Sequence, residues 1–302
     1  MQQPTSKPLG FGEILDQTFR IIKSNFKELF MISFWVIIPI IVLQTLLLTL
    51  TGRSFIFGGD IGEGAFNQLI NGAESIATTS PIDDLTSSLI SLLILFALPI
   101  LGGGIIWTVK YAREGQKPVA KEMIKKALPR YWPMFWSTLL IVLIVFAAIF
   151  FPILIVAFII GMFLVIEPIM GAIMAILLGL GFFIGLGLLF TRFTLFLPAV
   201  LFEKVAPGLG KSWHLTKKQT WKFFGLFIIL SIITSVISMI ISIPLTFLGD
   251  SVLYHVLSNV FSLVTTIIFI VGYAVIYFES TIRQEGTDLK SMIDEYHTSE
   301  SH

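Results

Sequence analysis

Six long stretches without a charged residue divide the chain, and they predict six membrane-spanning helices. The stretches are 29–52, 85–109, 131–166, 168–191, 223–249 and 251–278. A helix needs about 20 apolar residues to cross a hydrocarbon core of roughly 30 Å, so each stretch can hold one span. The third is too long for one upright span and too short for two with a turn. We therefore expect its start, at Tyr131, Trp132 and Trp136, to lie in the membrane interface.

A seventh uncharged stretch, 193–202, is too short to cross a bilayer. We expect it to extend the fourth helix beyond the bilayer, with a bend near Pro198, because proline disrupts a helix interior. The expected fold is therefore all-α. It comprises a single six-span membrane domain over 1–283 and a polar cytoplasmic tail over 284–302.

The composition agrees with a membrane protein. Hydrophobic residues make up 55% of the chain and charged residues 13%, which excludes a single soluble globule. The net charge is +1 and no basic domain stands out, so a nucleic-acid partner is not expected. The chain has no cysteine, which excludes disulfides and thiolate metal sites.

The basic residues predict the orientation in the membrane. Of the 20 Lys and Arg residues, all but Arg53 fall before span 1, between spans 2 and 3, between spans 4 and 5, or after span 6. These four places lie on one side of the predicted bundle. The positive-inside rule then places both termini in the cytoplasm.

Each odd-numbered span follows a basic segment with helical periodicity. The first covers 11–26, the second begins at Pro118 and the third at Pro207. Their apolar positions recur at steps of three and four, which predicts amphipathic elbow helices on the inner leaflet. Basic side chains of the second and third would then contact anionic headgroups, namely Lys125, Lys126, Lys217 and Lys218. The alternative is that these are ordinary basic linkers.

Two sequence regions carry a family resemblance. The segment RFTLFLPAVLFE at 192–203 precedes PGLGKSWHLTKKQTWKFFG at 207–225, and PLGFGEILDQTFRIIKSNF stands at 8–26. Together they resemble the glycerophosphoryl diester phosphodiesterase membrane domain family. In that family an Arg, a Pro and a Glu precede a Ser-Trp-x-Leu-Thr run. The resemblance extends from about 8 to 284 and, with no targeting peptide expected, implies the plasma membrane of a prokaryote.

The resemblance implies the membrane half of that family alone. Its phosphodiesterase activity belongs to a separate barrel, and such barrels need about 200 residues or more. No soluble stretch of that length is present, and the four histidines are scattered, at His214, His255, His297 and His302. We therefore expect no catalytic residue, no metal site and no cofactor, and a protein that is not an enzyme.

Arg192 and Glu203 form the most specific candidate site. Eleven residues are close to three helical turns, so an unbroken helix would place both on one face, about 16 Å apart. One interpretation is that Arg192 binds a lipid phosphate, because its fork matches phosphate geometry. The alternative is that Arg192 snorkels at the interface and Glu203 pairs with a nearby lysine.

Small and polar residues inside the spans offer a second candidate. A stripe of hydroxyl residues follows helical spacing on span 5, at Ser231, Ser235, Ser238 and Ser242. It could form a polar seam for a headgroup or water, but packing between helices is the favoured interpretation. The glycines at 171, 179, 181 and 185 on span 4 are likewise interpreted as packing positions.

These observations predict a non-enzymatic multi-pass protein that contacts lipid, as a scaffold or as a subunit of a membrane complex. Expected partners are membrane lipids with anionic headgroups and a further membrane or cytoplasmic protein. The alternative is a transporter or flippase-like component for a lipid or amphiphile. That alternative is weakened because no charge lies near the middle of any span. A lipid-modifying enzyme is the third reading.

Overall fold

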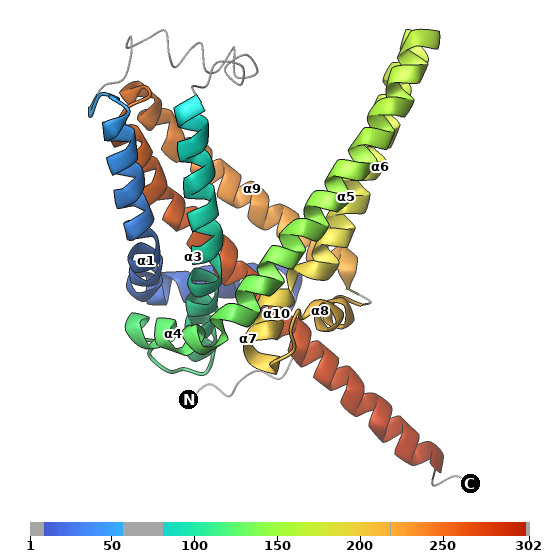
Figure 1. The fold of residues 1–302 in the computed structure, drawn as a ribbon. Coiled ribbons are helices and arrows are strands. Elements are labelled where there is room, and N and C mark those ends of the chain that lie inside the picture. The colour runs from blue at the N-terminus through green and yellow to red at the C-terminus, as the bar shows by residue number, and fades with distance from the viewer. Residues whose placement is uncertain (1–8, 57–80, 218, 300–302) are drawn as a thin grey trace. The chain divides into compact units, whose positions relative to one another are not determined.

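The computed structural model describes residues 9–56, 81–217 and 219–299, and the regular elements in these ranges are helices (Figure 1). Six helical stretches are long and apolar enough to cross a membrane. They cover Phe11–Leu50, Asp84–Arg113, Ala120–Phe163, Ile169–Glu203, Thr220–Leu248 and Val252–Gln284. The predicted all-α, six-span fold is confirmed, and the chain is a multi-pass membrane protein.

The helices follow the uncharged stretches closely. They are α1 (Phe11–Leu50), α3 (Pro81–Arg113), α4 (Ala120–Ala127), α5 (Tyr131–Ile166), α6 (Pro168–Thr194), α7 (Phe196–Glu203), α8 (Leu209–Thr216), α9 (Thr220–Leu245) and α10 (Val252–Ser299). Short 3-10 turns at Leu128–Arg130 and Thr246–Leu248 follow α4 and α9. Helix α10 continues the last span through most of the predicted polar tail.

The chain forms two compact units. Helices α1, α9 and α10 are each divided between these units. The first unit comprises residues 12–129 and 229–275, apart from those not described. The second comprises 5–11, 130–228 and 276–302, with the same restriction.

In the first unit, α1 packs along α3 through aliphatic side chains. Ile40 forms a buried cluster with Ile90 and Ala97. At Gly104, an added Cβ would lie 3.0 Å from Cγ2 of Ile32, so the glycine permits this close approach. Apolar burial of this kind contributes about 25 cal/mol per Å².

Polar contacts join two turns at one end of the first unit. Asp250 forms an ion pair with Arg53 and lies 2.9 Å from Nε2 of His255. Backbone N–H groups of Val252 and Leu253 donate to the carbonyls of Ser54 and Phe55, at 3.1 and 3.0 Å. The segment after α1 is therefore fixed to the start of α10.

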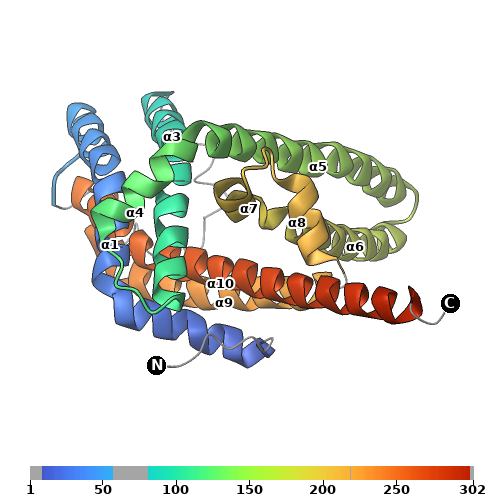
Figure 2. The same cartoon turned by 90° about the horizontal axis from the view of Figure 1, so that it is seen from below.

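In the second unit, α5 and α6 form an antiparallel hairpin and lie side by side in both views (Figures 1 and 2). Glu167 alone connects them, with extended backbone, and Pro168 opens α6 at a position where its missing N–H costs nothing. Their outward side chains are apolar and exposed, for example Phe158 and Ile169. This pattern is expected of helices that face lipid.

Helical segments are present at all three predicted elbow positions. Helix α1 is kinked at Asn25, where the side chains of Ser24 and Asn25 hydrogen-bond to the carbonyl of Ile21. The other two segments are α4 and α8, which begin two residues after Pro118 and Pro207. Their placement on the inner leaflet stays a prediction.

The apolar faces of these segments pack partly on protein. Met123 and Ala127 of α4 are fully buried, and Leu215 of α8 is nearly so. Part of the apolar face of α4 and of α8 therefore contacts protein. The lysines Lys121 and Lys125 of α4 are exposed on the opposite side.

Candidate functional site: a cationic pocket in the second unit

Arg192 lies in the last turn of α6, which ends at Thr194. The predicted bend near Pro198 is a break at Leu195, one turn earlier. The reason is that Pro198 has no N–H to donate to the carbonyl four residues before it, which belongs to Thr194. Helix α7 then restarts with Pro198 in its first turn. The unbroken helix that would place Arg192 and Glu203 on one face is not present, because Arg192 lies on α6 and Glu203 on α7.

Helix α8 is joined to the end of α6 beside Arg192. The hydroxyl of Ser212 donates to the backbone carbonyl of Arg192 at 2.7 Å. The next residue, Trp213, has its ring centre 4.3 Å from the guanidinium carbon of Arg192. Cation–π contacts of this kind contribute about 0.5–2 kcal/mol. The Ser-Trp pair of the sequence motif therefore holds the Arg192 backbone and side chain.

The tight turn before α8 depends on Gly208. Its φ is 73°, in the left-handed region, and an added Cβ would lie 2.8 Å from Cγ2 of Val200 and 2.9 Å from the carbonyl oxygen of Phe196. A side chain at this position would be strained and would clash with α7. The glycine therefore allows α8 to fold back towards α6.

The start of α9 approaches α6 through another glycine. An added Cβ at Gly187 would lie 2.3 Å from Cε2 of Phe224, so that ring sits directly against the α6 backbone. This contact places Lys222 and Thr220, in the first turn of α9, near the end of α6.

Lys222 and Arg283 converge on the backbone of Leu9. The ammonium of Lys222 donates to the Leu9 carbonyl at 3.2 Å, and Nη2 of Arg283 donates to the same oxygen. The N–H of Leu9 donates to Oε1 of Glu279 at 2.7 Å, and Nε of Arg283 donates to that same carboxylate oxygen at 2.7 Å. Glu279 is only 1% exposed. These contacts fix the segment before α1 to the part of α10 around Glu279 and Arg283.

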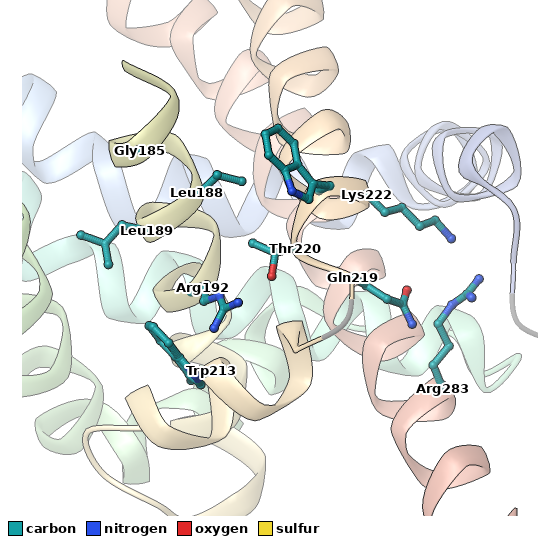
Figure 3. Close-up of a pocket in the computed structure, with 10 residues that line it drawn as sticks. Gly185, Leu188, Leu189, Arg192, Trp213, Gln219, Thr220, Lys222 and Arg283 are labelled. Carbon is teal, nitrogen blue, oxygen red and sulfur yellow. The ribbon is translucent and has the colours of Figure 1, made fainter. Parts of the chain in front are cut away.

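These elements line an open pocket of about 850 Å³ (Figure 3). Among the described residues, three cations line it together with aromatic, amide, hydroxyl and apolar groups, without a carboxylate. This lining comprises Gly185, Leu188, Leu189, Arg192, Trp213, Gln219, Thr220, Trp221, Lys222 and Arg283. The volume lies within the range of small-ligand sites. Arginine and lysine next to an apolar wall suit an amphiphile with an anionic group.

Glu203, the other half of the predicted pair, lies outside this lining. Its carboxylate lies 2.9 Å from Nζ of Lys211 and accepts a hydrogen bond from the hydroxyl of Tyr277 at 3.2 Å. The alternative interpretation, in which Glu203 pairs with a nearby lysine, therefore describes its contacts. It joins α7 to α8 and α10.

The predicted headgroup lysines do not gather at the pocket. Lys125 and Lys126 belong to α4 in the first unit, where the ammonium of Lys126 lies 4.2 Å from the ring centre of Tyr111. Lys217 is exposed after α8, and Lys218 lies outside the described residues. Contact of these lysines with headgroups stays a prediction.

The side chains of the predicted polar seam on α9 are exposed or bond within their own helix. Ser231, Ser235 and Ser238 are exposed, and the hydroxyl of Ser242 donates to the carbonyl of Met239 at 2.9 Å on its own helix. On α6, an added Cβ at Gly179, Gly181 or Gly185 would meet nothing within 4 Å. The bond of Ser242 within its own helix agrees with the part of our preferred interpretation that assigns these hydroxyls to the preceding turn, and packing of the stripes against other helices stays a prediction.

Of the lining residues, the sequence had assigned only Arg192 to a ligand site, so that Trp213, Gln219, Lys222 and Arg283 were among those missed. The sequence did contain a signal for these cations, since the predicted cytoplasmic ends of spans 4, 5 and 6 each carry a basic residue. The sequence did not indicate that these three ends meet. Glu279 was also missed, although it directly follows the last uncharged stretch.

Comparison with known proteins adds a family without an assigned activity. Residues 33–281 match the model of a family described as a domain of unknown function (DUF7847). No curated protein and no solved structure matches the chain.

Proposed function

Because the chain belongs to this family of unknown function, which covers most of its length, we propose a function from the geometry of the pocket. The protein is a non-enzymatic membrane scaffold, or a subunit of a membrane complex, that holds an anionic phospholipid headgroup. It resides in the plasma membrane with both termini in the cytoplasm, so the pocket opens at the inner leaflet.

One observation carries the proposal: three cations from three different helices line a pocket that also has an apolar wall. Arg192, Lys222 and Arg283 come from α6, α9 and α10, and Leu188 and Leu189 lie on α6 (Figure 3). A basic group near an anionic membrane surface contributes about 1 kcal/mol, and a half-buried guanidinium that meets a phosphate contributes more.

The family resemblance at 192–203 and 207–225 belongs to the same proposal. These two segments supply Arg192, Trp213 and half of the remaining lining residues. A relationship to the membrane half of the glycerophosphoryl diester phosphodiesterases would fit a site for phosphodiester headgroups without a catalytic barrel.

Lipid retention tests the proposal directly. The full chain, extracted in mild detergent, is expected to keep anionic phospholipid through purification, as measured by lipid extraction and mass spectrometry. Arg192→Gln should reduce the retained amount by about tenfold, because it removes the group best suited to the phosphate. Lys204→Gln is the matched control, since it removes one charge from an exposed residue of the same unit that lies outside the pocket.

Equal retention in both variants would reject the lipid site. The non-enzymatic part is tested separately, by incubating purified protein with glycerophosphodiesters with and without divalent metal. Turnover that survives purification and is lost on substitution of one carboxylate would reject that part. Transport of lipid between the leaflets of reconstituted vesicles, abolished by Arg192→Gln, would favour a flippase-like component instead.

A further inference from the structure

Two of the three pocket cations are bound to the backbone that precedes α1. The ammonium of Lys222 donates to the Leu9 carbonyl at 3.2 Å, and Nη2 of Arg283 donates to the same oxygen. Figure 3 shows the charged ends of Lys222 and Arg283 pointing towards one another. We call Leu9 and Gly10, the two described residues before α1, the strap. The strap therefore occupies donors from both α9 and α10.

The strap is bound through its backbone. The N–H of Leu9 donates to Oε1 of Glu279 at 2.7 Å, so side chains bind both the amide and the carbonyl of this one residue. The next residue, Phe11, packs on α9, where an added Cβ at Gly225 would lie 3.6 Å from its ring. The side chain of Leu9 takes no part in these hydrogen bonds. The seating of the strap therefore depends on the backbone N–H and carbonyl of residue 9.

The bonds to the Leu9 carbonyl can be exchanged for bonds to an anion. An ammonium and a guanidinium each carry several N–H donors, so Lys222 and Arg283 can redirect the donors now on the strap and keep their other contacts. Both bonds end on a neutral carbonyl, whereas a phosphate oxygen adds the attraction of its negative charge. Because both residues also line the pocket, an anionic headgroup bound there competes with the strap for the same donors.

We propose that the strap is an autoinhibitory element, which an anionic phospholipid displaces when it binds the pocket. In the closed state the strap holds Lys222 and Arg283, and the headgroup is left with Arg192. In the open state Leu9 has left Glu279, and Lys222 and Arg283 turn their donors to the headgroup. Because the strap and the lipid compete, each lowers the apparent affinity of the other by the same factor. This proposal rests on the proposed function and adds its regulation.

The backbone contacts provide a matched pair of variants at one position. Leu9→Pro removes the N–H that binds Glu279, whereas Leu9→Ala keeps both backbone groups. The full chain and both variants are delipidated in detergent and titrated with dioleoyl phosphatidylglycerol, and bound lipid is counted by native mass spectrometry. We expect Leu9→Pro to bind about tenfold more tightly than the wild type, the effect of one charge-assisted contact, and Leu9→Ala to bind as the wild type does.

Hydrogen exchange measures the strap itself in the wild type. Saturating dioleoyl phosphatidylglycerol is expected to speed exchange at the Leu9 amide by about tenfold, because the coupling between lipid and strap is reciprocal. Dioleoyl phosphatidylcholine, whose ammonium balances its phosphate, is the control and should leave this exchange unchanged. The measurement needs no substitution, so it decides the proposal even if Leu9→Pro lowers the melting temperature.

The outcomes separate this proposal from the proposed function. Unchanged affinity in a Leu9→Pro variant that melts like the wild type would overturn the strap, as would Leu9 exchange that phosphatidylglycerol leaves unchanged or slows. An equal gain in Leu9→Ala would also overturn it, because that variant keeps the backbone contacts. If lipid retention is still lost in Arg192→Gln, the proposed function survives these results. Absence of lipid binding in both the wild type and Leu9→Pro would overturn both.

A soluble source of the same chemistry is tested with glycerophosphoglycerol, the deacylated headgroup. Only the intact lipid is expected to speed exchange at Leu9, because the apolar wall at Leu188 and Leu189 adds contacts with an acyl chain. Equal acceleration by the headgroup at the same concentration would overturn a membrane lipid as the ligand that displaces the strap.

Discussion

The guanidinium carbon of Arg192 lies 4.3 Å from the ring centre of Trp213, and the hydroxyl of the preceding residue, Ser212, binds the Arg192 carbonyl. Two consecutive residues of α8 thus hold Arg192: Trp213 contacts its side chain and Ser212 binds its backbone. The indole is 40% exposed and covers one side of the guanidinium. The planar group is therefore held in place before any ligand arrives, which lowers the entropy cost of binding.

Arg192→Lys is expected to weaken lipid retention although it keeps the charge. An ammonium lacks the planar fork and stacks less well on indole. Trp213→Leu should have a similar effect, because it removes the contact that orients Arg192. We expect a loss of about threefold to tenfold in each, measured as retained anionic lipid. Full retention in both variants would make Arg192 a simple interface anchor.

Gly208→Ala is expected to destabilise the second unit. The left-handed backbone alone costs about 1–2 kcal/mol for a residue with a Cβ, and the contacts with Val200 and the Phe196 carbonyl add to it. Gly210→Ala, two residues later in α8, is the matched control because its Cβ would meet nothing within 4 Å. Melting temperatures in detergent measure both. Equal effects of the two substitutions would contradict the described turn.

Glu279→Gln is expected to loosen the segment before α1. The buried carboxylate accepts from the Leu9 N–H and from Nε of Arg283, and a neutral amide accepts these bonds more weakly. Breaking a buried pair typically costs about 3–5 kcal/mol. Hydrogen exchange at the Leu9 amide should therefore become at least about tenfold faster. Unchanged exchange would show that Glu279 does not hold this segment.

Asp250 predicts a pH dependence of stability. The hydrogen bond from His255 lowers the pKa of Asp250, desolvation opposes this shift, and the charge of Arg53 supports it. A lowered pKa means that the folded state favours the carboxylate. The resulting stabilisation is present above the ordinary aspartate pKa of about 3.9 and is lost as the pH falls through the lower folded value.

The difference in melting temperature between wild type and Asp250→Asn measures this effect across pH. It should favour the wild type at pH 7, by an amount equivalent to about 1 kcal/mol or less because the aspartate is more than half exposed. It should disappear in strong acid. A difference that is constant with pH would rule out the ionised carboxylate as its cause.

The orientation can be tested with single cysteines, because the chain contains none of its own. Gln116 lies between α3 and α4, and Glu167 connects α5 to α6; both are exposed. The basic residues place Gln116 in the cytoplasm and Glu167 outside. An impermeant maleimide applied to sealed cells should therefore label Glu167→Cys and leave Gln116→Cys unmodified. The reverse pattern would invert the topology.

The sequence predicted the spans well because a helix that crosses a lipid bilayer needs about 20 consecutive apolar residues. Each uncharged stretch became a helix, and α5 covers the third stretch from Tyr131 to Ile166 without interruption. The break before Pro198 was placed one turn too late, since the effect of a proline falls on the carbonyl that precedes it by four residues.

The site was only partly predictable, for a physical reason. Arg192 stood out because a charge at the end of an apolar run is conspicuous. Lys222 and Arg283 did not, because their role depends on which helix ends meet, and that is decided by contacts such as Gly187 with Phe224. Side-chain packing between helices has no short-range sequence pattern comparable to the apolar span.

The connection between α5 and α6 constrains how the protein enters the membrane. With Glu167 as the sole linking residue, α5 and α6 have almost no loop that could lie in water between them. We therefore expect the two helices to cross the membrane together as one hairpin that carries a single carboxylate at its turn. A longer linker would let the two helices insert one after the other, so the short turn favours their joint insertion into the membrane.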